Sequence, residues 1–164
     1  EEDPKEFVSL VRFLGVQYVQ LHAPVDPMVL ESIRKLAPDL ILIKSLIIGR
    51  YSWETLLDYA RECEILSDAF LTDTFDPKTT AMGATGKTHD WSISARLRNV
   101  LKKPLILAGG LTPFNLQMAI EAVHPWGVDV HTGVEDCTGR KVKLLVQQFL
   151  HVSQQVFKTI PPYL

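Results

Sequence analysis

Residues Pro104–Pro113 read PLILAGGLTP, and this stretch carries the information that decides the fold class. Four apolar residues follow the first proline without a polar residue between them, which is typical of a strand covered on both faces, as in a parallel sheet. The pair Gly109-Gly110 then turns the chain, and Thr112-Pro113 has the cap-then-proline pattern that begins a helix. The stretch therefore predicts one strand–turn–helix unit of an α/β fold.

The same alternation extends in both directions along the chain. Short apolar runs of strand length are separated by segments with helical spacing of their apolar residues. Strands are expected at 16–21, 40–44, 69–73, 104–108 and 128–131, and helices at 4–14, 26–36, 52–62, 91–101, 113–123 and 140–159. Because such units are joined by right-handed crossovers, they predict a parallel sheet in a single domain over residues 1–164.

Two architectures fit five such units. One is an open, doubly wound sheet of five strands, and the other is part of a (β/α)8 TIM-type barrel. The expected strands recur at a mean interval of about 27 residues, so eight units would take about 216 residues, which lies in the range of barrels. The 164 residues of this chain are about 50 too few for a whole barrel.

Composition excludes several classes of protein. Hydrophobic residues make up 46% and charged residues 22%, as in a globular protein. With 17 Lys+Arg against 19 Asp+Glu, the chain has no basic excess for a nucleic acid partner. It also has no apolar run of the ~18 residues that a membrane span needs. Two distant cysteines, Cys63 and Cys137, form neither a disulfide framework nor a close metal-binding pair, so we expect a cytoplasmic protein without a metal.

Polar or glycine residues stand at the end of every expected strand. In both α/β architectures the carboxyl ends of parallel strands form the rim that carries the site. Five such endings indicate one shared rim and a small-molecule site. The endings are His22, Lys44-Ser45, Asp73, Gly109-Gly110 and His131-Thr132-Gly133.

Two of these endings favour phosphate as the group that is bound. Gly109-Gly110 precedes an expected helix start, and Thr132-Gly133 turns out of the next strand. Main-chain N–H groups freed by glycine, together with a helix dipole, attract anions. The alternative is that the glycines only permit tight turns, but their occurrence on consecutive strands favours a phosphate site.

The polar segment 74–90 is expected to be a mobile active-site loop over this rim. Its Gly83–Thr88 stretch, GATGKT, is similar to a nucleotide-binding P-loop, but that motif requires glycine five positions before Gly86 and the chain has Ala81 there. Lys44, at an earlier strand end, is interpreted as a solvated residue.

Three side chains at the rim are candidates for chemistry. Asp73 closes an apolar strand, where desolvation can raise the pKa of a carboxylate and make it a general acid. The alternative is a capping role, for which Asp76, before a proline, is better suited. His22 either binds substrate or has a structural hydrogen bond. Asp129 lies within the last expected strand and would need a fixed partner or a substrate amine if it were buried.

Several motifs, in this order, resemble the phosphoribosylanthranilate isomerase family. They are VQLH (Val19–His22), Thr72-Asp73, GATGKTHDW (Gly83–Trp91), LAGGLTP (Leu107–Pro113) and GVDVHTGVE (Gly127–Glu135). The resemblance runs from Phe7 to Phe149 and implies a (β/α)8 barrel that performs an Amadori rearrangement without a cofactor. It implies that Asp73 is the general acid, that Gly109, Gly110, Thr132 and Gly133 hold the substrate phosphate, that Asp129 lies near the anthranilate and that His22 lines the pocket.

The chain also departs from the family pattern. The family's general base is a cysteine in a Lys-x-Cys-Gly motif on its first strand, and neither this motif nor the family's substrate-binding arginine has a counterpart here. The resemblance therefore implies an N-terminally incomplete barrel that covers about the last five βα units. We expect this chain to be inactive alone and its open edge to favour a homodimer. Two alternatives stay open: a non-catalytic shortened paralogue that binds a phosphorylated metabolite or a protein, and another barrel enzyme with a sugar-phosphate substrate.

Overall fold

Parallel strands and helices alternate along the chain in the computed structural model, which describes residues 3–83 and 85–160. The strands are β1 (Tyr18–Leu21), β2 (Ile41–Ile48), β3 (Ala69–Asp76), β4 (Ala81–Met82), β5 (Leu105–Leu107) and β6 (Gly127–Val128). The helices are α1 (Pro4–Leu14), α2 (Pro27–Leu36), α3 (Trp53–Glu64), α4 (Trp91–Val100), α5 (Leu116–Val123), the short 3-10 helix η1 (Thr132–Val134) and α6 (Lys143–Thr159).

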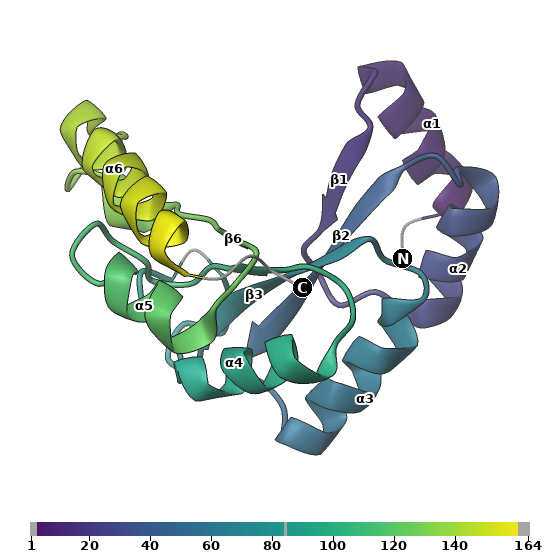
Figure 1. Ribbon diagram of the computed structural model, residues 1–164. Helices are drawn as coiled ribbons and strands as arrows, with labels where there is room; N and C mark the ends of the chain where they lie inside the picture. Colours follow the sequence, from purple (N-terminus) through teal and green to yellow (C-terminus); the bar gives the residue numbers. More distant parts are fainter. Residues whose placement is uncertain (1–2, 84, 161–164) are drawn as a thin grey trace.

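The order of the strands distinguishes between the two expected architectures. The sheet runs β1-β2-β3-β5-β6 with every pair parallel, and the two-residue β4 pairs antiparallel with β3. A doubly wound sheet reverses its strand order at a switch point, whereas a barrel wall keeps chain order. The helices follow one another in chain order along an arc outside the strands (Figure 1). The open doubly wound alternative is therefore wrong, and the sheet is a section of a barrel-type wall.

The core lies between the sheet and the helices. Alternate residues of β2, such as Leu42 and Leu46, are 0% exposed and belong to one cluster with Leu30 of α2 and Ala60 of α3. Burying a leucine side chain of this kind stabilises the fold by roughly 1.5–3 kcal/mol. The other face of β2, at Ile41 and Ile43, is only partly covered.

The start of the chain has an uncovered apolar surface. Four large side chains of α1 and β1 are strongly exposed, at 56%, 86%, 59% and 69%; they are Leu10, Phe13, Leu14 and Tyr18. β1 also pairs with one neighbour only, so it is an edge strand. We call these four side chains the edge patch.

Aspartate side chains begin several helices as their sequence predicts. Asp3, Asp26 and Asp90 each accept a hydrogen bond from a main-chain N–H of the first turn, and Pro4 and Pro27 occupy the first helical position. Within the described residues, no helix combines the length and the apolar composition needed to cross a bilayer.

Several expected boundaries are wrong. β2 and β3 continue to Ile48 and Asp76 because their ladder extends to the pair Ile48↔Thr74, so the first part of the expected loop 74–90 is strand. β6 ends at Val128 and leaves Asp129 outside the strand. α5 begins at Leu116 rather than near Pro113, because residues 112–115 form a separate hydrogen-bonded turn.

Candidate active site

The strand register turns the predicted acidic residues toward one side of the sheet. Asp73 of β3 is opposite Ile47, and Gly127 of β6 is opposite Ile106, which lies on the same face as Asp73. Because side chains alternate along extended chain, Asp129, two residues after Gly127, is directed toward this inner face. Asp73, Asp129, Gly109, Gly110 and Thr132 line one small pocket at the carboxyl ends of the strands. The structure thus brings together five of the seven residues proposed from the sequence.

Asp73 is partly exposed and lies beneath the start of the loop. Its Oδ1 accepts a hydrogen bond from the Thr74 N–H at 2.7 Å. A Cβ on Gly83 would overlap with the Asp73 carboxylate and lie 2.6 Å from Cε1 of His22, so both side chains press against this glycine. His22 is exposed, and its Nε2 is hydrogen bonded to the Met82 carbonyl oxygen. The sixth proposed residue, His22, is therefore a neighbour of Asp73.

The two glycine turns, at Gly109-Gly110 and at Thr132-Gly133, are in close contact with each other, and the first also contacts the loop at Lys87. Gly109 and Gly110 have φ values of 91° and 63°, which favour glycine. A Cβ on Gly110 would overlap with the main chain of Lys87, and a Cβ on Gly133 would overlap with the Leu111 carbonyl. The two turns proposed for phosphate therefore touch each other at Gly133, the seventh proposed residue. The expected helix start at Pro113 is wrong, so the N-terminus of α5 is farther along the chain than the phosphate interpretation assumed.

His89, to which the sequence alone assigns no role, ties the end of the loop to β3 and α4. Its Nδ1 lies 3.0 Å from Thr74 Oγ1, and its Nε2 lies 2.6 Å from Ser94 Oγ. Burial lowers the pKa of His89 to about 4, so the imidazole is neutral near pH 7. The histidine inside the Gly-Lys-Thr-His-Asp-Trp segment was the available signal, but its partners come from other elements.

The buried carboxylate of Asp76, at the end of β3, binds the loop through Lys87. Asp76 is 4% exposed, and its Oδ2 accepts a hydrogen bond from Lys87 Nζ at 2.7 Å. The Lys87 ammonium, together with the Lys78 N–H, keeps the pKa of this carboxyl below its usual range. Lys87 is thus directed to Asp76 rather than to the glycine turns, and Asp76 organises the turn as the sequence indicated.

Lys44 is placed differently from the expectation. It is 0% exposed rather than solvated, and its Nζ donates to the carbonyl oxygens of Leu21 and Ala23 at 2.8 Å and of Ser45 at 3.0 Å. Burial lowers the pKa of Lys44 to about 8. The side chain points to the helix side of β2 and fixes the turn that follows β1.

Neither cysteine is placed to act as a base at the Asp73 pocket. Cys63 is buried in α3, where burial raises the pKa of its thiol, and Cys137 is exposed after η1. Within residues 3–83 and 85–160, no group of three or more His, Cys, Asp or Glu side chains is arranged to hold a metal ion.

Comparison with known proteins places this site in a family context. A family model described as N-(5′-phosphoribosyl)anthranilate (PRA) isomerase matches residues 1–152. N-(5′-phosphoribosyl)anthranilate isomerase 2 of Methanosarcina mazei is 38% identical over 157 residues, which are 95% of this chain and 68% of that protein. The isomerase of Methanothrix thermoacetophila is 38% identical over 143 residues, 87% of this chain and 64% of that protein. The chain thus spans about two thirds of these relatives.

Solved structures give the same result for the fold. A phosphoribosyl anthranilate isomerase from Thermococcus kodakaraensis matches with a TM-score of 0.73 and 29% identity, over 94% of this chain and 71% of that one. A phosphoribosyl anthranilate isomerase in complex with reduced 1-(o-carboxyphenylamino)-1-deoxyribulose 5-phosphate matches with a TM-score of 0.70 and 27% identity, over 94% and 68%. These structures support the assignment of the sheet to a barrel-type wall.

Proposed function

Because the chain belongs to the N-(5′-phosphoribosyl)anthranilate isomerase family, we propose that it supplies the phosphate-binding and general-acid part of that isomerase. The reaction is the rearrangement of N-(5′-phosphoribosyl)anthranilate to 1-(2-carboxyphenylamino)-1-deoxyribulose 5-phosphate in tryptophan biosynthesis. The observation that carries the proposal is the meeting of Asp73 with the turns at Gly109-Gly110 and Thr132-Gly133 around one pocket.

The proposed acid is Asp73. Its protonated carboxyl gives a proton to the ribose ring oxygen, the C1′–O bond breaks, and the nitrogen lone pair forms a Schiff base. A base then removes the C2′ proton to give an enolamine, and tautomerisation of the enolamine gives the ketone product. Asp73 lies against Gly83 at the start of the loop.

The remaining pocket residues bind and orient the substrate. Main-chain groups of the two glycine turns hold the phosphate without a metal or a cofactor. Asp129, exposed at the same pocket, accepts a hydrogen bond from the anthranilate amine, and His22 contacts the substrate beside Asp73. The family's general base is a cysteine of a Lys-x-Cys-Gly motif that residues 1–164 do not contain, so we expect no turnover by this chain alone. The segment 74–90, less the strand residues of β3 and β4, is the active-site loop of this single-domain partial barrel.

The decisive experiment replaces the proposed acid in a form that carries the upstream segment. Asp73→Asn should lower kcat by roughly 10²–10⁴-fold, the usual contribution of a general acid. The affinity of the variant for reduced 1-(o-carboxyphenylamino)-1-deoxyribulose 5-phosphate, the reduced product analogue, should change little, because the amide of asparagine keeps the shape of the carboxyl. Asp58→Asn, at an exposed position of α3, is the matched control. Near-full turnover by Asp73→Asn would show that another group is the acid.

A second function rests on a different observation. Both cysteines of the chain lie away from the Asp73 pocket, as in a paralogue that binds a phosphorylated metabolite without turnover. The DNA upstream of the Glu1 codon discriminates: an in-frame Lys-x-Cys-Gly segment supports the isomerase, and a start codon directly before Glu1 supports the paralogue. For either function we propose a cytoplasmic location, in agreement with two free thiols.

A further inference from the structure

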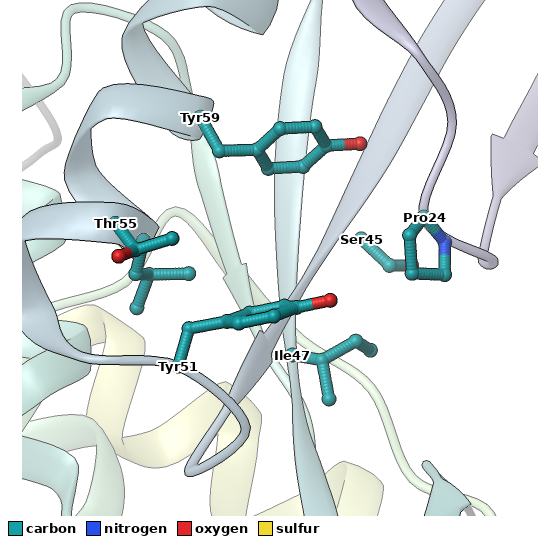
Figure 2. Close-up of a pocket in the computed structure, with 7 residues that line it drawn as sticks. Pro24, Ser45, Ile47, Tyr51, Thr55 and Tyr59 are labelled. Carbon is teal, nitrogen blue, oxygen red and sulfur yellow. The ribbon is translucent and has the colours of Figure 1, made fainter.

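A second cavity, of about 270 Å³, lies outside the Asp73 pocket. It is bordered by the end of β2, the start of α3 and the turn after β1, and it is open to solvent beside Tyr51, which is 47% exposed (Figure 2). Its lining consists of Pro24, Ser45, Ile47, Tyr51, Thr55, Leu56 and Tyr59, none of which lines the Asp73 pocket. A dry apolar cavity of about 150 Å³ is large enough to bind benzene, so this one has room for one or two fused rings.

Two tyrosine rings form opposite walls of the cavity. Figure 2 shows the rings of Tyr51 and Tyr59 one above the other with open space between them. Tyr59 is fixed, because its hydroxyl donates to the Val25 carbonyl at 2.9 Å and accepts from the Val25 N–H at 3.1 Å. Aromatic rings held in this way offer stacking surfaces to a third ring, since planar π-systems prefer offset-stacked contacts.

A cation lies over each of these rings. Lys44 Nζ is 5.8 Å from the centroid of Tyr59, and Arg50 Cζ is 5.1 Å from the centroid of Tyr51. The attraction between each cation and its ring helps to hold both walls in place. The two positive charges disfavour a cationic guest and favour an electron-rich ring, and the mostly apolar lining disfavours an anion.

The wall formed by β2 adds a polar contact. β1 ends at Leu21, opposite Lys44, whereas β2 continues to Ile48. The Ile41 N–H donates to the Gln17 carbonyl, so odd-numbered residues of β2 direct their main-chain groups toward β1. Ile47 is therefore turned toward the cavity at a point where β1 has already ended. Its N–H and C=O offer a donor and an acceptor to a guest.

We propose that this cavity binds a neutral planar aromatic molecule of one or two fused rings that carries an N–H or O–H at its edge. The ring stacks between Tyr51 and Tyr59, and the polar edge is hydrogen bonded to the main chain of Ile47. This binding uses none of the residues of the proposed reaction, so it stands or falls separately from the isomerase proposal.

The test is titration of the 164-residue chain with indole, followed by amide NMR and calorimetry. Saturable binding is expected, with the Ile47 amide among the largest shifts and with Gly109 and Gly110 unmoved. The donor is tested with 1-methylindole, which should bind at least threefold more weakly. The absence of saturable binding would overturn the proposal, and so would the largest shifts at the glycine turns or equal affinity for 1-methylindole.

Variants locate the site. Tyr51→Leu should weaken indole binding at least tenfold, while Tyr18→Leu, at the exposed tyrosine of β1, should leave it within twofold. If Tyr51→Leu unfolds the chain, Thr55→Trp fills the same cavity from the exposed surface of α3 and should abolish binding. Asp73→Asn should not change the affinity. Unchanged binding in Tyr51→Leu or in Thr55→Trp contradicts the proposal.

Discussion

At the scale of single residues, His89 makes the stability of the protein depend on pH. Its folded-state pKa of about 4 lies below the ordinary 6.5, so the unfolded chain takes up a proton first as the pH falls. The stabilisation is therefore complete above about pH 6.5 and is lost between that pH and about 4. We predict that the free energy of unfolding, measured with urea, falls by up to about 2 kcal/mol from pH 7 to pH 5 through this group.

The matched variants separate His89 from the other histidines. His89→Gln should lower stability at pH 7 and flatten the decline toward pH 5, because the group that titrates is gone. His151→Gln, at an exposed position of α6, should leave both the stability and its pH profile unchanged. An equally steep decline in His89→Gln would assign the pH dependence to another group.

Individual residues also show where sequence interpretation reaches its limit. The expected strand ends select Asp73, and the cost of an unpaired carboxylate inside an expected strand selects Asp129; the two line one pocket. The same rule failed for Lys44, whose neighbour Ser45 lies on the opposite face of β2. The register that directs Lys44 to the helix side is set by pairing with β1 and β3, which local sequence does not contain.

At the level of secondary-structure elements, the Gly110 turn and the loop pack so closely that position 110 has no room for a side chain. Gly110→Ala should destabilise the protein and weaken binding of the reduced product analogue at least tenfold, because the new Cβ would overlap with the main chain at Lys87 and Thr88. Calorimetric titration and urea unfolding measure the two effects.

Gly139→Ala is the matched control for this variant. Gly139 also has positive φ, 80°, but a Cβ there would meet no atom within 4 Å. It should therefore cost only the left-handed backbone penalty of about 1–2 kcal/mol and leave affinity unchanged. Equal effects of the two variants would mean that backbone conformation, and not the loop contact, limits Gly110.

The sequence predicted which segments are helices and which are strands, but not where each of them begins and ends. Apolar runs and proline caps identified the five parallel strands and six long helices, since these signals are local. The extension of β3 through Asp76 depends on its ladder with β2 and on the hairpin with β4, and the late start of α5 depends on the exchange of hydrogen bonds between Thr112 and Asn115. Such contacts form only when distant segments or side chains meet.

At the scale of the whole molecule, the edge patch should drive self-association. It joins exposed apolar side chains to an edge strand, a combination that seeks a partner. We predict that the 164-residue chain forms dimers or larger species and that Phe13→Glu shifts it toward monomer, as measured by sedimentation velocity. Phe114→Glu, at an equally exposed phenylalanine before α5, is the control and should have no effect. Association that is unchanged in Phe13→Glu would exclude the edge patch as its cause.

The overall architecture could be predicted only in part from the chain itself. The interval of about 27 residues between expected strands is compatible with a barrel wall and with an open sheet, because a periodic spacing does not state which strands are neighbours. The strand order excludes the doubly wound arrangement directly. Which strands pair with one another depends on tertiary packing. For this chain, only the family motifs implied the strand order of a barrel.

The strand order allows the units to fold one after another while the protein is synthesised. Each strand after β1 that joins the parallel ladder pairs with the parallel strand preceding it in the chain, so none must be inserted between two that are already paired. During synthesis, each unit leaving the ribosome can dock on a surface that is already complete. Closing the short connections costs little entropy, and each step adds a buried strand pair. These units can therefore fold by ordered addition, from β1 toward α6.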